Sequence, residues 1–179
     1  MSSAPVFRFE PSELTLQPSV DAQAAALYYR QQGPWPAWKL KTPDRVREEA
    51  RARVSKMGGD PRNPQEVLAM SELQFGQYRG LTFWWLLGND VGYACGVIAS
   101  HERERESGDT SQTPLMEHND ALTSYARLFP PMVAAIARRR MSEGSQSVRG
   151  LDSTLVGFGA HAQVSFKSLY EAKDTESRT

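Results

Sequence analysis

Apolar residues recur mostly at the spacing of an α-helix, and this pattern covers the larger part of the chain. Over residues 43–56, Val46, Ala50 and Val54 repeat every four positions, which predicts a helix with one narrow apolar face. Over residues 91–106 the apolar positions again share one face until the tail becomes wholly charged. Further helices are predicted over residues 20–32, 83–87, 119–129 and 132–141.

Several of these helices begin after a residue whose side chain can cap them. Thr42-Pro43 is the strongest of these signals, because a Thr N-cap is followed by proline at the first helical position. Gly33 and the pair Gly58-Gly59 are expected to end the first two helices. The predicted N-caps are Ser19, Thr42, Thr82 and either Asn89 or Asp90.

A shorter period, typical of a strand, occurs where Leu73 and Phe75 alternate with polar neighbours. Gly76 and Gly80 bracket Gln-Tyr-Arg just after it, and we expect a β-hairpin or tight turn with positive φ at the glycines. The predicted fold class is therefore α+β and mostly helical, with small β-hairpins each followed by helices.

Residues 156–170 resemble this segment in outline. Phe158-Gly159 align with Phe75-Gly76, and the later apolar and hydroxyl positions also correspond. We interpret the similarity as one degenerate internal repeat. Two unrelated strand–turn–helix elements remain the alternative.

These patterns divide the chain into five parts. The expected parts are a disordered or draped N-terminal arm (1–18), a helical region with a Trp/Pro loop (19–62), the main glycine-turn module (63–142), a linker (143–153) and a degenerate, truncated second copy (154–179).

Composition and charge narrow the class of protein. Of the 179 residues 40% are hydrophobic and 23% charged, and 21 basic residues balance 21 acidic ones, so global charge favours no particular partner. Cys95 is the single cysteine, which excludes an intrachain disulfide and favours an intracellular, nuclear or cytoplasmic protein. We find no secretory signal and no apolar run long enough for a membrane span. The oligomeric state stays open.

The sequence offers no recognisable set of catalytic or metal-ligating residues. Its three histidines are scattered, and Cys95 lies six positions from His101, which is not the spacing of a metal pair on a helix. The charged run from His101 to Glu106 is typical of a solvated helix face. We therefore predict no enzyme, no metal site and no cofactor.

Basic residues are concentrated between positions 36 and 62, a segment that holds eight Lys and Arg residues and four acidic residues. Arginine beside aromatic rings can hold a nucleic-acid strand, although arginine-rich helices are often plain surface faces. The candidate nucleic-acid-binding residues are Tyr78, Arg79, Lys39, Lys41 and Arg45.

The glycine-turn segment also resembles a known module with an "FGKYKG"-type signature. The matching residues are Phe75, Gly76, Tyr78, Gly80, Thr82, Leu86, Asp90 and Tyr93. The module is known from the C-terminal region of exodeoxyribonuclease X-like proteins and from uncharacterised vertebrate and transposon-associated proteins. Gln77 departs from the pattern, and the nuclease's acidic motifs are not recognisable.

This resemblance implies a non-catalytic accessory role in nucleic-acid processing or a mobile-element origin. The expected function is therefore a non-enzymatic interaction module. The alternative is a protein–protein scaffold module without nucleic-acid contact, in which Trp35, Trp38 and Trp84 or Trp85 meet a partner.

Overall fold

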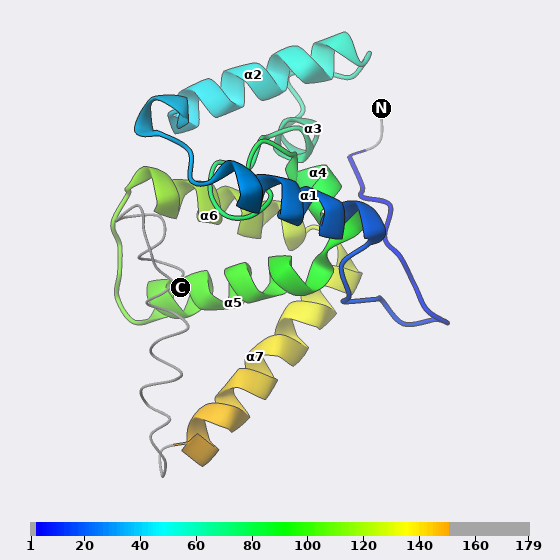
Figure 1. Cartoon of the computed structure of the whole chain (residues 1–179), viewed down its shortest axis with the longest axis vertical. Helices are drawn as coiled ribbons and strands as arrows, with labels where there is room; N and C mark the ends of the chain where they lie inside the picture. Colours follow the sequence, from blue (N-terminus) through cyan, green and yellow to red (C-terminus); the bar gives the residue numbers. More distant parts are fainter. Residues whose placement is uncertain (1–2, 151–179) are drawn as a thin grey trace.

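A computed structural model describes the backbone of residues 3–150 and the side chains of residues 3–144. Within this range the chain forms seven α-helices and one short 3₁₀ turn (Figure 1). They are α1 (Val20–Gln32), η1 (Ala37–Lys39), α2 (Pro43–Lys56), α3 (Pro64–Ala69), α4 (Phe83–Asn89), α5 (Val91–Glu106), α6 (Pro114–Ala126) and α7 (Pro130–Gly150).

The predicted α+β fold class is wrong for the described part of the chain. Between residues 3 and 150 there is no sheet, only two isolated antiparallel bridges, Phe9 with Leu14 and Glu72 with Thr82. The reason lies at Thr82, which already caps α4. The returning segment has therefore become helical before a second pair of residues can align, and the expected β-hairpin is reduced to a single bridge.

The turn itself follows the sequence prediction. Gly76 and Gly80 have φ values of 88° and 92°, in the left-handed region that favours glycine. Leu73 closes the loop, since its N–H donates to Leu81 O and its carbonyl accepts from Gly80 N–H, both at 2.7 Å. Tyr78, at the tip, turns inward and is 1% exposed. Glycine thus permits the reversal, and the aromatic ring buries it.

All the predicted N-caps occur, with Asp90 rather than Asn89 capping α5. Ser19 Oγ accepts from Ala22 N–H, and Thr82 Oγ1 accepts from Trp85 N–H. Thr42 Oγ1 likewise caps α2, with Pro43 in the first turn. Asp90 accepts from Tyr93 N–H.

One helix begins earlier than its pattern predicted. The helix expected over residues 119–129 is α6, which starts at Pro114 behind the Thr113 N-cap. Asn119 lies within this helix and is buried. Thr113-Pro114 repeats the Thr-Pro start signal of α2.

The core lies where α4, α5, α6 and α7 meet. Its centre combines the rings of Tyr78, Phe83 and Tyr125 with aliphatic side chains, all at most 1% exposed. In Figure 1, α2 lies at one edge of the molecule, α1 crosses in front, and α7 projects away at the opposite edge. The central aliphatic residues include Leu86, Ile98, Leu122 and Ile136.

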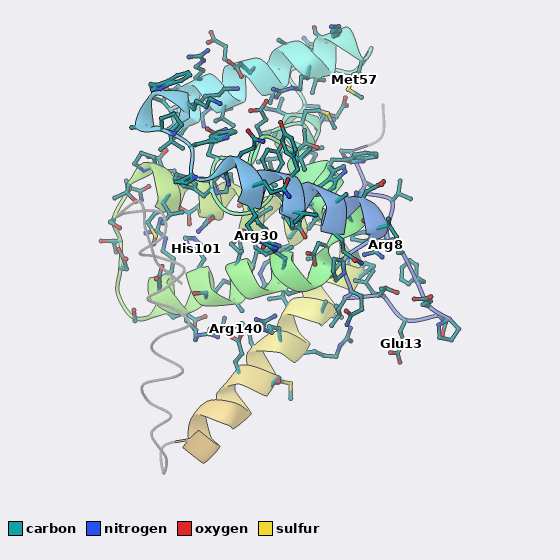
Figure 2. All side chains as sticks on the ribbon, in the orientation of Figure 1. Arg8, Glu13, Arg30, Met57, His101 and Arg140 are labelled. Atoms are coloured by element: carbon teal, nitrogen blue, oxygen red, sulfur yellow. The ribbon has the colours of Figure 1, made fainter. Side chains whose placement is uncertain are left out.

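The two ends of the chain differ in what the structure describes. Residues 3–18 are draped over the ends of α4, α5 and α6, and Figure 2 shows Arg8 in this arm close to the helical body. The backbone of 143–150, expected as part of a linker, continues α7. The predicted second copy, residues 154–179, lies outside the described residues. Among those that are described, no helix has the length and apolar character to cross a membrane.

Candidate nucleic-acid interface

Arg79 connects two parts of the fold and does not project into solvent as a free cation. Its guanidinium lies over the rings of Tyr29 and Trp35, at 5.4 and 5.6 Å from their centroids. It also donates to the carbonyls of Gly33 and Tyr29, at the C-terminal end of α1. Carbonyls at a helix end attract cations. Arg79 therefore fastens the Gly76–Gly80 turn to α1.

Tyr78 is equally committed to the interior. Its hydroxyl donates to Asp90 Oδ2 at 2.5 Å, and its ring packs against Trp85 and Tyr93. Burial and the Asp90 carboxylate raise the pKa of this phenol. A ring in this position is not available to stack on a base. The predicted candidates Tyr78 and Arg79 thus hold the fold together in this structure.

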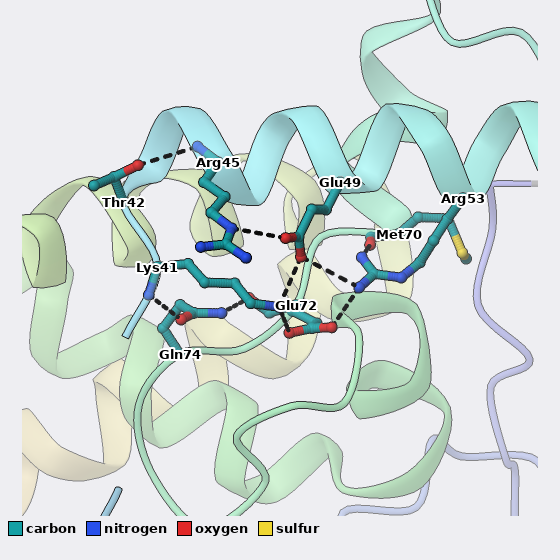
Figure 3. A network of polar contacts seen from close by, with 8 residues as sticks. All are labelled: Lys41, Thr42, Arg45, Glu49, Arg53, Met70, Glu72 and Gln74. Atoms are coloured by element: carbon teal, nitrogen blue, oxygen red, sulfur yellow. Dashed lines mark hydrogen bonds and ion pairs between the residues drawn. The ribbon is translucent and has the colours of Figure 1, made fainter. Parts of the chain in front are cut away.

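Lys41 and Arg45 belong to a network of ion pairs between α2 and the segment after α3 (Figure 3). Lys41 Nζ lies 2.7 Å from Glu49 and 2.9 Å from Glu72, and Arg45 Nε lies 2.9 Å from Glu49. Burial opposes the charge of Lys41, but its hydrogen bonds to both carboxylates outweigh this and raise its pKa. Arg53 also binds Glu72. Lys41 is therefore neutralised by its neighbours.

Lys39 is the predicted candidate that remains most accessible. Its ammonium lies 5.6 Å from the centroid of the Trp38 ring, and Trp38 is 79% exposed. Arg45 is also exposed, although Glu49 partners it. The structure does not bring these two cations together with Tyr78 or Arg79 into one site.

A different basic surface surrounds a cleft of about 760 Å³ between α2, α3 and α6. The cleft is lined by apolar side chains from all three helices and from α4. This volume is typical of a small-molecule site. We call it the α2–α6 cleft, and its apolar lining includes Val46, Val67, Leu68, Phe75, Phe83 and Ala121.

Three arginines supply most of the positive charge that lines the α2–α6 cleft. Arg47 and Arg51 come from successive turns of α2, and Arg62 comes from the loop before α3. Arg47 and Arg62 each pair with an exposed carboxylate close in sequence, and such surface pairs are weak. Arg51 makes no ion pair within the described part of the chain. We call these three residues the arginine rim.

Glu117 is the one carboxylate that lines the cleft. It projects from α6, one turn before Ala121. Its side chain has no hydrogen-bond or ion-pair partner among the described residues. The cleft thus combines a cationic rim with one unengaged acceptor on its wall.

His118 also lines the cleft, but both of its ring nitrogens are occupied. Nε2 accepts from Gln74 N–H at 3.2 Å, and Nδ1 lies 2.9 Å from Asn119 Oδ1, which requires a proton on Nδ1. Burial lowers the pKa of His118 to about 4, so the imidazole is neutral at pH 7. His118 is consequently placed to hold the cleft wall together and not to accept a proton from a ligand.

The other chemically suggestive residues are also structural. Burial raises the pKa of Cys95 to about 11, which makes the thiol a poor nucleophile. His101 Nε2 and Arg105 both bind Asp120, joining α5 to α6. Across the described residues no group of three or more His, Cys, Asp or Glu side chains could hold a metal ion.

The arginine rim lies within the predicted basic segment, but none of its three residues is among the predicted nucleic-acid-binding residues. The available signal was the i, i+4 spacing of Arg47 and Arg51, which places both on one face of α2. No signal pointed to Arg62 or Glu117, because the cleft forms only when separate elements pack.

Comparisons with protein-family models, with curated proteins and with solved structures find no match for this chain. The site is therefore interpreted from its own geometry.

Proposed function

We propose that this chain is a non-enzymatic interaction module that binds nucleic acid at the arginine rim of the α2–α6 cleft. The observation that carries the proposal is the placement of Arg47, Arg51 and Arg62 around one apolar cleft. Among the residues that line the cleft only Glu117 is acidic, and Asp44 and Asp60, which pair with Arg47 and Arg62, are exposed surface partners. The cations of the neighbouring network are instead held between Glu49 and Glu72.

Arginine suits this role because its planar guanidinium binds phosphate through two hydrogen bonds and also stacks on flat rings. Phosphate contacts of this kind release counterions, so the affinity falls as salt is added. The protein as a whole carries no net charge. Binding therefore depends on this local surface and not on general attraction.

The resemblance of residues 75–93 to the exodeoxyribonuclease X-like module supports an accessory role in nucleic-acid processing. The residues that carry the resemblance are mostly structural here, as Tyr78, Gly80 and Asp90 illustrate. A module whose signature maintains a fold is consistent with binding rather than catalysis.

Fluorescence anisotropy with labelled single-stranded and duplex DNA at several salt concentrations tests this function. Arg47→Gln/Arg51→Gln/Arg62→Gln should abolish most of the binding and flatten its salt dependence, because three phosphate contacts are lost. Lys56→Gln is the control for the loss of one positive charge outside the site, because Lys56 is exposed on α2 but does not line the cleft. Binding that is absent even at low ionic strength would exclude the proposal.

A protein–protein scaffold is the second candidate, and several exposed apolar side chains favour it. Trp38 is 79% exposed, and the outer face of α1 exposes Val20, Leu27 and Tyr28. Trp84, by contrast, donates to Ala4 O and packs against the core. A partner that survives nuclease treatment and is lost in Trp38→Ala would support the scaffold function.

A further inference from the structure

We propose that the α2–α6 cleft accepts one unpaired nucleobase with an exocyclic amino group, while the flanking phosphates lie on the arginine rim. This inference rests on the proposed function and specifies its ligand. It predicts preference for a single strand, loop or bulge over a duplex.

The shape of the cleft is the first argument. An apolar cleft of about 760 Å³ between three helices has room for a flat ring to lie against its wall. A paired base exposes only its edges in the grooves of a duplex, and an unpaired base exposes its faces for stacking. The Phe75 side chain, which contacts the His118 ring edge-on, forms part of the apolar wall that would face such a base, and the buried Phe83 ring supports this wall from behind.

The position of Glu117 is the second argument. A carboxylate repels phosphate and accepts hydrogen bonds from N–H groups, so it would meet the base and not the backbone. Aspartate and glutamate accept from the N4 amino group of cytosine, and adenine offers a comparable N6 amino group. Thymine carries the carbonyl oxygen O4 at the ring position where cytosine carries its amino group, and a carboxylate repels this oxygen. Glu117 should therefore select against thymine.

The combination of charges argues for a ligand that carries both an anionic group and N–H donors over a purely anionic ligand. A ligand that carried only carboxylates would satisfy Arg47, Arg51 and Arg62 but would leave Glu117 facing another negative charge. A nucleotide carries an anionic group and N–H donors in one molecule. It can engage the arginine rim and Glu117 simultaneously.

The test uses the full chain and three labelled oligonucleotides of equal length: oligodeoxycytidine, oligodeoxythymidine and an abasic strand. Because the three carry the same phosphates, charge contributes equally to each. We expect oligodeoxycytidine to bind about tenfold or more tightly than the abasic strand, from enclosure of the base. We expect a further discrimination of about tenfold against thymidine.

Two variants, Glu117→Gln and Ala121→Phe, test the binding of the base separately from the binding of the phosphates. Glu117→Gln should remove the preference for cytidine over thymidine, because a neutral amide both donates and accepts hydrogen bonds. The control Glu48→Gln, at an exposed position of α2 outside the cleft lining, should leave this preference unchanged. Ala121→Phe should narrow the cleft and reduce the binding of oligodeoxycytidine toward the level of the abasic strand. Ser124→Trp, at an exposed position of the lining, blocks the mouth if Ala121→Phe does not fold.

The outcomes distinguish failure of the base site from failure of the proposed nucleic-acid binding. Failure of all three strands to bind at low salt overturns the proposed function itself. Equal binding of cytidine and abasic strands, unchanged by Glu117→Gln and Ser124→Trp, overturns the base site alone. A third outcome is that a tryptophan-containing acidic peptide displaces the oligonucleotide from the wild-type protein but binds poorly to Ala121→Phe. That result would identify a peptide as the occupant of the cleft and would also overturn the base site.

Discussion

Two glycines in α5, Gly92 and Gly96, show how backbone contacts decide the effect of one methyl group. A Cβ on Gly92 would lie 2.6 Å from Leu16 O, a backbone atom of the N-terminal arm, which also accepts a hydrogen bond from Gly92 N–H. A Cβ on Gly96 would instead meet the Arg139 guanidinium at 3.0 Å. A flexible side chain can move aside, and a tethered backbone cannot do so without losing contacts.

We therefore expect opposite results from the same substitution. Gly92→Ala should lower the free energy of unfolding by about 1–3 kcal/mol, because the clash exceeds the gain in helix propensity of roughly 1 kcal/mol. Gly96→Ala should be neutral or stabilising by up to about 1 kcal/mol. Urea denaturation of both variants measures this, and a Gly92→Ala protein at least as stable as Gly96→Ala would contradict the packing of the arm.

His118 gives stability a pH dependence of predictable sign. Its pKa falls from 6.5 to about 4 on folding, so between these values the unfolded chain binds more protons than the folded one. Stability contributed by the neutral imidazole is therefore fully present above pH 6.5 and is lost as the pH falls toward 4. We expect a loss of about 1–2 kcal/mol between pH 7 and pH 5.

Urea midpoints at pH 7 and pH 5 measure this loss. His118→Gln should be less stable at both pH values, because the hydrogen bond to Gln74 is disturbed, but its dependence on pH should be clearly smaller. The window above pH 5 avoids most of the effect of the paired carboxylates, such as Glu49 and Asp120, whose pKa values are lowered and whose contributions are lost in more acidic solution. An unchanged slope in His118→Gln would assign the effect to other groups.

At the scale of elements, local chemistry predicts where helices begin better than it predicts pairing. A hydroxyl residue before proline caps both α2 and α6, because each side chain accepts from an N–H in the first turn. The α2 start was predicted from this signal. The prediction for α6 begins at Asn119 and is wrong by five residues, because Thr113-Pro114 lies at the end of a polar stretch typical of a loop.

The predicted hairpin does not form, and the alternation of apolar and polar residues could not show why. Leu73 and Phe75 do alternate with polar residues, and both turn glycines have positive φ as expected. A ladder also needs length on the returning side, and there Thr82 begins α4. The sequence held this information, since Thr82 was itself predicted as a cap. The two predictions compete for the same residues, and the helix prevails.

At the scale of the whole molecule, the candidate site depends on packing between segments distant in sequence. Arg51 on α2, Arg62 before α3 and Glu117 on α6 converge only in the folded chain. Pattern analysis identified a basic segment but could not tell which cations would be neutralised. The Lys41–Glu72 pair, which joins two separate elements, illustrates a contact that no local spacing predicts.

The N-terminal arm packs on the helical body without lining this cleft, so its removal can test stability separately from binding. Arg8 donates to Gly88 O and Asn89 O, Trp84 Nε1 donates to Ala4 O, and Tyr125 donates to Ser3 O at 2.6 Å. These contacts close the ends of α4, α5 and α6. None of the arm residues lines the α2–α6 cleft.

Removal of residues 1–16 should therefore destabilise the protein without weakening the binding site. We expect the free energy of unfolding to fall by on the order of 2–4 kcal/mol, because several hydrogen bonds, most of them partly buried, and apolar contacts are lost together. Urea denaturation measures the loss, and anisotropy at a temperature where the variant is folded measures oligonucleotide affinity, with Arg8→Ala as a milder version. If the truncation weakened binding while stability stayed the same, the arm and not the cleft would carry the nucleic acid.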